Sequence, residues 1–191
     1  LSLSKEDPAL ESQIYLNLGS AYYRMNQNEK ALATLSLGDF RNLQDNEAKK
    51  YHQLYALLSQ QLGKKEQTLM ALMRSFQDKR SVAELKSEPR YTEAEEMFFK
   101  MTPTERVRLL EDFDQEKNLA VPYLAYREAE IAFKEGDKEK VSNFTSWIEK
   151  RYRSNTEIME LLKTLGVRSE NDSAKIELRY IGVALPLTGE R

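Results

Sequence analysis

The sequence predicts an all-α fold, a solenoid of helical hairpins, and three observations support this prediction. Apolar residues recur at spacings of three and four along most of the chain, which is the pattern of one helix face. Short polar turns separate these periodic segments in pairs. Only 7 glycines and 5 prolines occur in 191 residues, which favours helix over loop. Because one hairpin cannot bury its own apolar face, we expect neighbouring hairpins to stack.

The first hairpin is the best formed, and it centres on residues 14–32. Asp7 and Pro8 predict the start of its first helix, since proline is favoured at the first helical position. Asn26, followed three residues later by Glu29, predicts a capping box for the second helix. We expect one apolar face of the first helix to be buried, formed by Leu10, Ile14, Leu18, Ala21, Tyr22 and Met25.

Two small residues of this hairpin, Gly19 and Ala31, fall where its two helices would touch. Small side chains let the backbones approach, so we expect a close contact there. A second hairpin follows over residues 46–76. Aligning the two turns places Thr68 opposite Ala31, which is a repeat of 37 residues.

The remaining helices complete a third, irregular hairpin, a fourth hairpin and a last capping helix. Thr102, Pro103 and Glu105 give a strong start signal, because they combine a cap, a first-turn proline and an acid at the third position. The register of the fourth hairpin places Glu128 at a core position. The helices are expected near residues 82–85, 92–101, 102–113, 122–135, 141–152 and 154–166.

The pattern changes near the end of the chain. Residues 167–174 are polar and predict a linker. Residues 175–185 first alternate and then become continuously apolar, which predicts a strand buried on both faces, as in a parallel α/β sheet. We therefore expect a helical domain over residues 1–166, then the linker, then the start of a truncated α/β domain over residues 175–191.

Composition and charge exclude several classes of function. The formal net charge is −2, so neither nucleic acid nor an anionic membrane is implied as a general partner. The absence of cysteine excludes disulfides, thiolate metal sites and a cysteine nucleophile. The sequence shows no apolar run of the roughly 18 residues that a membrane span needs, and no signal peptide. Because it begins at Leu1, we expect a piece of a longer protein, whose leader or lipid anchor would lie upstream.

No constellation of residues predicts catalysis, a cofactor or a metal site. His52 is the only histidine, and Lys49 and Lys50 beside it disfavour a cation, so we expect it at the surface or at the edge of the core. Paired carboxylates can perform glycoside chemistry, but here they lie on amphipathic helices among basic residues. We interpret them as solvated faces. The groups are Glu93, Glu95 and Glu96; Glu111, Asp112 and Asp114; and Glu128 with Glu130.

The first hairpin resembles a tetratricopeptide repeat. The residues at the signature spacing are Tyr15, Leu18, Gly19, Tyr22, Ala31 and Leu35. Residues 133–141 match less closely, the spacing exceeds the roughly 34 residues of the family, and residues 77–118 fit only as a degenerate unit. The resemblance therefore implies a tetratricopeptide-like solenoid and not a regular array.

The segment from Ile181 to Gly189 looks like the first strand of the type I periplasmic binding fold. Tetratricopeptide-like helices followed by such a strand resemble the bacterial outer-membrane lipoproteins that activate penicillin-binding proteins. This resemblance implies a non-enzymatic periplasmic scaffold that regulates peptidoglycan synthesis, with a penicillin-binding protein or peptidoglycan as its partner. One alternative is a docking or dimerisation arm of a periplasmic amino-acid-type receptor, and another is a cytoplasmic repeat adaptor.

The inner helix faces of such solenoids take peptides. We expect the residues that the repeat register places near these faces to bind a protein partner, namely Tyr23, Arg24, Gln53, Gln60, Tyr126 and Glu130. The family's cytosolic co-chaperones grip a C-terminal carboxylate with lysines and asparagines. That clamp is absent, because the matching positions carry Leu16, Ser20, Gln53 and Leu57.

Overall fold

The computed structural model describes residues 7–113 and 118–166, and this part of the chain is all-α, without strands. It forms two compact units, one that ends at Val121 and one that begins at Pro122. The sequence patterns do not predict this division within residues 1–166. The predicted linker and strand lie outside the described residues.

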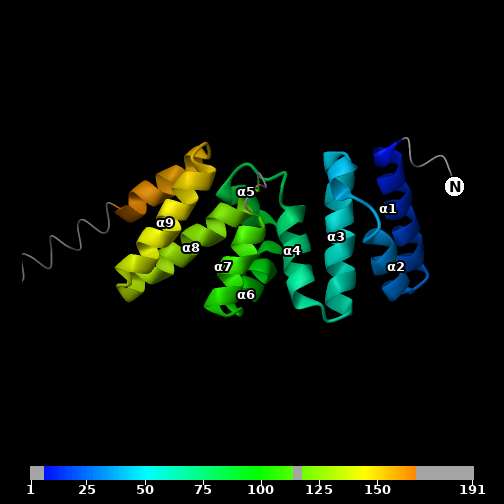
Figure 1. Ribbon diagram of the computed structural model, residues 1–191, viewed down its shortest axis with the longest axis horizontal. Coiled ribbons are helices and arrows are strands. Elements are labelled where there is room, and N and C mark those ends of the chain that lie inside the picture. Colours follow the sequence, from blue (N-terminus) through cyan, green and yellow to red (C-terminus); the bar gives the residue numbers. More distant parts are fainter. Residues whose placement is uncertain (1–6, 114–117, 167–191) are drawn as a thin grey trace, which may run out of the picture. The chain divides into compact units, whose positions relative to one another are not determined.

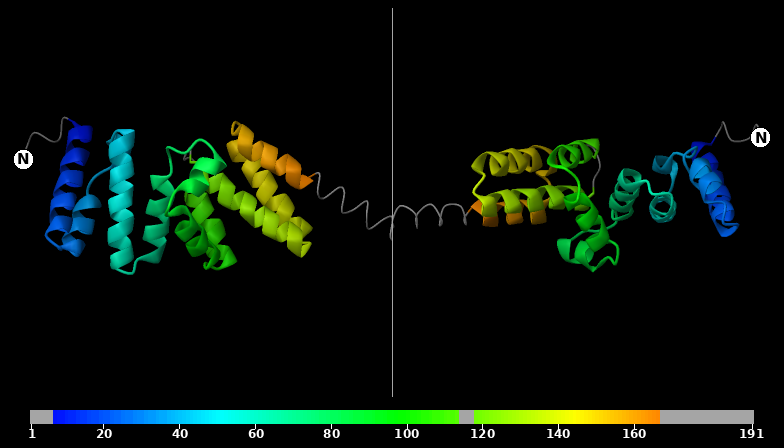
Figure 2. Two further views of the ribbon diagram at one scale, coloured as in Figure 1. Left: turned by 180° about the vertical axis from the view of Figure 1, so that it is seen from behind. Right: turned by 90° about the horizontal axis from the view of Figure 1, so that it is seen from below.

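Helices of the first unit pack against neighbours that are close in the chain (Figure 1). α1 packs on α2, α2 on α3, α3 on α4, and α4 on α6. The views from behind and from below show the same succession (Figure 2). The elements are α1 (Pro8–Arg24), α2 (Asn28–Leu35), the 3-10 helix η2 (Phe40–Asn42), α3 (Asp45–Gln61), α4 (Lys65–Ser75), α5 (Val82–Ser87), α6 (Tyr91–Phe99) and α7 (Pro103–Asp112).

Two of the three helix starts for which a capping residue is named above follow that signal. The Asp7 carboxylate accepts hydrogen bonds from the first-turn backbone of α1, and Thr102 forms the predicted capping box with Glu105 at the start of α7. The predicted cap at Asn26 is wrong. Asn26 has a φ of 57°, a left-handed conformation that asparagine tolerates, and α2 begins after Gln27 without a side-chain cap.

The buried face of α1 differs from the predicted one. Its buried residues are Ser12, Leu16 and Gly19. The expected contact between Gly19 and Ala31 is confirmed, since a Cβ at Gly19 would lie 3.3 Å from the Ala31 carbonyl oxygen. Close approach requires small residues, so the helices meet there and the larger apolar side chains face away. The prediction is therefore wrong for five exposed residues, Leu10, Ile14, Leu18, Ala21 and Met25.

Asn118 connects the start of α8 (Ala120–Glu135) to the end of α4. Its buried side-chain amide donates a hydrogen bond to the Met73 carbonyl oxygen. Its side-chain oxygen accepts a hydrogen bond of 3.0 Å from the Ala120 backbone N–H. One side chain thus satisfies two backbone groups at a buried junction, which most other residue types could not do.

The substitution Asn118→Leu should lower the free energy of unfolding by about 2 kcal/mol, because a side chain of similar size removes both hydrogen bonds of Asn118. The Ala120 N–H loses its Asn118 partner, and the Met73 carbonyl oxygen keeps only the bond from the Phe76 N–H. Urea denaturation monitored by circular dichroism measures this loss. Asn143→Leu is the matched control, since Asn143 is exposed on another helix. Equal stability of the two variants would contradict the role assigned to Asn118.

The second unit contains most of α8, the helix α9 (Lys138–Tyr152) and further helical residues 156–166. Gly136 turns the chain between α8 and α9 with a φ of 78°, as its position between two helical patterns predicts. The expected core position of Glu128 is confirmed, because its carboxylate is buried and lies 3.4 Å from the Lys140 ammonium. The interpretation of Glu128 as part of a solvated face is therefore wrong.

Candidate functional site

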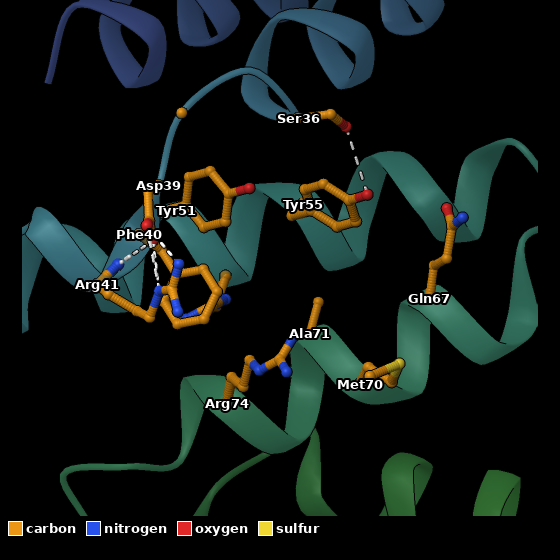
Figure 3. Close-up of a pocket in the computed structure, with 12 residues that line it drawn as sticks. Ser36, Asp39, Phe40, Arg41, Tyr51, Tyr55, Gln67, Met70, Ala71 and Arg74 are labelled. Atoms are coloured by element: carbon orange, nitrogen blue, oxygen red, sulfur yellow. Dashed lines mark hydrogen bonds and ion pairs between the residues drawn. The ribbon is translucent and has the colours of Figure 1, made fainter. Parts of the chain in front are cut away.

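A pocket of about 590 Å³ lies between α3, α4 and the segment that joins α2 to α3. Figure 3 shows aromatic, polar and charged side chains around it. We call it the aromatic pocket. It is lined by Ser36, Gly38, Asp39, Phe40, Arg41, Tyr51, His52, Tyr55, Gln67, Met70, Ala71 and Arg74.

Two tyrosines of α3 form one wall of the aromatic pocket. Tyr51 and Tyr55 are four residues apart and therefore share a helix face, and their ring centroids are 5.7 Å apart. The Tyr51 hydroxyl donates a hydrogen bond of 3.1 Å to the Leu35 carbonyl oxygen, which fixes this ring. Burial raises the pKa of Tyr51 to about 12, so it remains a neutral donor. Tyr55 is only half-buried, and its hydroxyl lies 3.4 Å from that of Ser36.

The charged residues of the pocket differ in their surroundings. Arg41 holds Asp39 through a bidentate ion pair, with a closest distance of 2.7 Å. The hydrogen bond from Arg41 lowers the pKa of Asp39. The Arg74 guanidinium instead lies 5.1 Å from the ring centroids of both Phe40 and Phe113, in cation–π geometry. Two guanidiniums and one carboxylate give the lining a net positive charge.

His52 forms part of the pocket wall as a neutral group. The side chain is 2% exposed, and its ring centroid lies 4.5 Å from that of Phe40 in an edge-on arrangement. Burial, together with repulsion from Arg74, lowers its pKa to about 3. The expectation of a surface or edge position missed this burial. His52 lies four residues from both Ala48 and Ala56, which are buried. This helical spacing was the sequence signal that could have predicted the burial of His52.

A second hollow, of about 660 Å³, lies where α3 and α4 meet α6 and α7. Gln60, one of the predicted partner-binding residues, lines it. The Gln60 amide donates a hydrogen bond of 2.7 Å to Glu93 and accepts one of 2.8 Å from Arg90. Arg90 and Glu93 also form an ion pair of 3.0 Å. This network joins α3 to α6, so Gln60 has a structural role in addition to any contact with a partner.

The other predicted site residues of the first unit lie on α1 and α3. Gln53 is exposed on α3, two turns before Gln60 and on the same side of the helix. Arg24 is exposed in the last turn of α1. Tyr23 is half-buried and packs against the core formed by the first three α-helices. None of these three lines the aromatic pocket, which the sequence did not reveal.

The two predicted site residues of the second unit both lie on α8. Tyr126 is buried and stacks on Tyr123, with ring centroids 6.1 Å apart. A buried ring offers little surface to a partner. Glu130 lies 3.4 Å from Arg127 and 3.6 Å from Lys134, so its carboxylate is held within a local ion-pair group.

Within residues 7–113 and 118–166, no group of three or more acidic or histidine side chains is arranged to hold a metal ion. None of the helices in this part of the chain is long and apolar enough to cross a membrane. Comparison of the chain with protein family models, with curated proteins and with solved structures finds no significant match. Proposals about function therefore rest on the residues and geometry described above.

Proposed function

We propose that this chain is a non-enzymatic scaffold that binds a segment of a partner protein in the aromatic pocket. The observation that carries the proposal is the pocket itself, a hollow of about 590 Å³ with aromatic walls. Tyr55 and Met70 are half-buried in its wall and Gln67 is exposed beside them, so apolar and hydrogen-bonding surface is accessible together. Such a combination is typical of recognition sites.

A tetratricopeptide-like solenoid is the architecture that we propose for the helical part. The packing of α1 to α6 on elements close to them in the chain supports this, because repeat arrays bury their core between neighbouring units. The contact at Gly19 and Ala31 supports it as well, since both residues belong to the signature spacing. Exposed residues of the predicted inner faces, Arg24 and Gln53, would extend the interaction surface beyond the pocket.

The pocket chemistry favours a partner segment that carries an apolar side chain next to an anionic group. Phe40, Tyr51 and Tyr55 supply apolar surface. The lining also carries the guanidiniums of Arg41 and Arg74, and guanidiniums favour a carboxylate beside that side chain. Arg74 already contacts two aromatic rings, so it would act chiefly through its positive charge.

The proposed partner is a penicillin-binding protein, and the proposed location is the periplasm, with an outer-membrane lipid anchor in the full-length protein. The residues from Ile181 to Gly189, which follow the helical part in the sequence, resemble the first strand of the type I periplasmic binding fold. This resemblance supports the assignment. A role in regulating peptidoglycan synthesis follows from such a partner.

A pull-down from envelope extract with the full-length protein tests the proposal, and it should recover a peptidoglycan synthase. The variant Tyr55→Ala should bind that partner about tenfold more weakly, since an aromatic anchor typically contributes more than about 1 kcal/mol. Tyr22→Ala is the matched control, because Tyr22 packs on the same core but does not line the pocket. Recovery of no synthase, or equal binding by both variants, would overturn the proposal.

A further inference from the structure

One face of α1 exposes a continuous apolar stripe. Its large side chains are Leu10, Ile14, Leu18 and Met25, which are 48%, 43%, 41% and 55% exposed. Ala21, also exposed, lies among them on the same helix face. Elsewhere in the described part of the chain the only large apolar side chains that are exposed are Leu37 and Val107. Scattered apolar residues are ordinary on surfaces, but a concentrated stripe marks an interaction site.

The opposite face of α1 already makes the contacts that hold this helix in its unit. Ser12, Leu16 and Gly19 are buried there, and Gly19 approaches Ala31 and Leu35 of α2. The stripe is therefore not needed for the packing of α1 on α2. It is a second apolar face on one helix, and burying it requires a further helix-sized surface.

We propose that the stripe is covered by α1 of a second copy of this chain, packed antiparallel across a two-fold axis. The spacing of the stripe supports this occupant. The two-fold axis would pass between Asn17 and Leu18. It would place Leu10 of one copy level with Met25 of the other, and Ile14 level with Ala21. Leu18 would lie close to Leu18 of the other copy. A two-fold interface requires such self-complementarity, because each copy presents the same surface.

The charges on α1 favour the antiparallel direction. The same axis would place Glu11, in the first turn of one copy, level with Arg24, in the last turn of the other. Antiparallel packing therefore places the acidic end of each helix at the basic end of the other, and it aligns the two helix dipoles favourably. Parallel packing would place like charges at the same level, which disfavours that arrangement.

Cysteine cross-linking tests both the identity of the helix that covers the stripe and the direction in which it packs. The sequence has no natural cysteine that could form other disulfides. The variants Leu10→Cys and Met25→Cys of the 191-residue chain are purified separately, mixed and oxidised. The mixture should form a disulfide-linked dimer between unlike chains, whereas each variant alone should not. A mixture of Leu10→Cys with Val107→Cys is the control, because Val107 is similarly exposed but lies on α7. Equal cross-linking in the control, or within either single variant, would overturn the proposal.

Sedimentation velocity over a range of concentrations measures the association itself. The unmodified chain should populate a dimer, and Ile14→Lys should raise the dissociation constant about a hundredfold, since it places a charge in both halves of the interface. Val107→Lys should leave the dissociation constant unchanged. Circular dichroism checks that each variant is folded. A chain that sediments as a monomer at every concentration, or a dimer that Ile14→Lys leaves intact, would contradict the proposal.

Discussion

The substitution Gly19→Val should lower the free energy of unfolding by about 3 kcal/mol, because it overpacks the contact between α1 and α2. A Cβ at this position would lie 2.8 Å from Cγ and Cδ2 of Leu35 and 3.3 Å from the Ala31 carbonyl oxygen. Leu35 is fully buried, so its side chain has little room to move aside. The two further methyl groups of valine would force the helices apart. Urea denaturation of the variant measures the loss.

Two comparisons separate this clash from the general cost of a β-branched residue in a helix. Asn17→Val changes an exposed residue of the same helix and should alter stability by less than about 1 kcal/mol. Leu35→Ala removes the side chain that Gly19→Val would meet, so the double variant should be more stable than the sum of the two single losses predicts. Strict additivity of the two substitutions would show that the contact at Gly19 is not the cause.

The contrast between the two faces of α1 shows what sequence periodicity can and cannot predict. Spacings of three and four correctly identified a helix, but apolar residues occur on both sides of α1. The hydrophobic pattern alone favoured the side with Leu10 and Ile14. The helices in fact meet at Gly19, because a small residue permits a closer approach of backbones than a large apolar one. The same small residues had predicted the contact, and they were the better guide to the buried face.

Local signals predicted helix starts where one side chain decides the geometry. Asp7 and Thr102 cap their helices as expected, since each needs only nearby backbone N–H groups. Asn26 was ambiguous, because asparagine serves both as a cap and as a left-handed turn residue. The second role prevails here, at a φ of 57°. Composition gives no means of choosing between them.

The candidate site was less accessible from the sequence than the helices. Tyr51 and Tyr55 have the spacing of a shared face, which is a visible signal. Their meeting with Phe40 and Met70 depends on how the segment after α2 passes over α3 and α4, and this is a tertiary property. Gln60 was predicted from the register, but the structure adds its bonds to Arg90 and Glu93, which come from 30 and 33 residues away.

Acidification from about pH 6.5 to about pH 4.5 should destabilise the first unit. The cause is His52, which is the only histidine of the chain. In the unfolded chain its imidazole binds a proton near its ordinary pKa of 6.5, whereas in the folded protein burial and Arg74 lower the pKa to about 3. Between these values the unfolded state binds more protons, so stability falls as the pH falls. Because one pKa unit corresponds to about 1.4 kcal/mol, the loss over these two pH units should be roughly 2 kcal/mol.

The variant His52→Leu should remove most of this dependence, because leucine fills a similar volume without a titrating group. Urea midpoints measured from pH 7 to about pH 4.5 compare the two proteins, and any loss from carboxylate protonation in this range is shared by both. The lowered pKa values of Asp39, Asp78 and Glu105 predict a separate loss that begins at about pH 5 and is common to both proteins. The NMR signal of the single imidazole supplies an independent check, since it should remain that of the neutral ring at pH 5. Parallel stability profiles for the two proteins, or a protonated ring at that pH, would contradict the burial of His52 between Phe40 and Arg74.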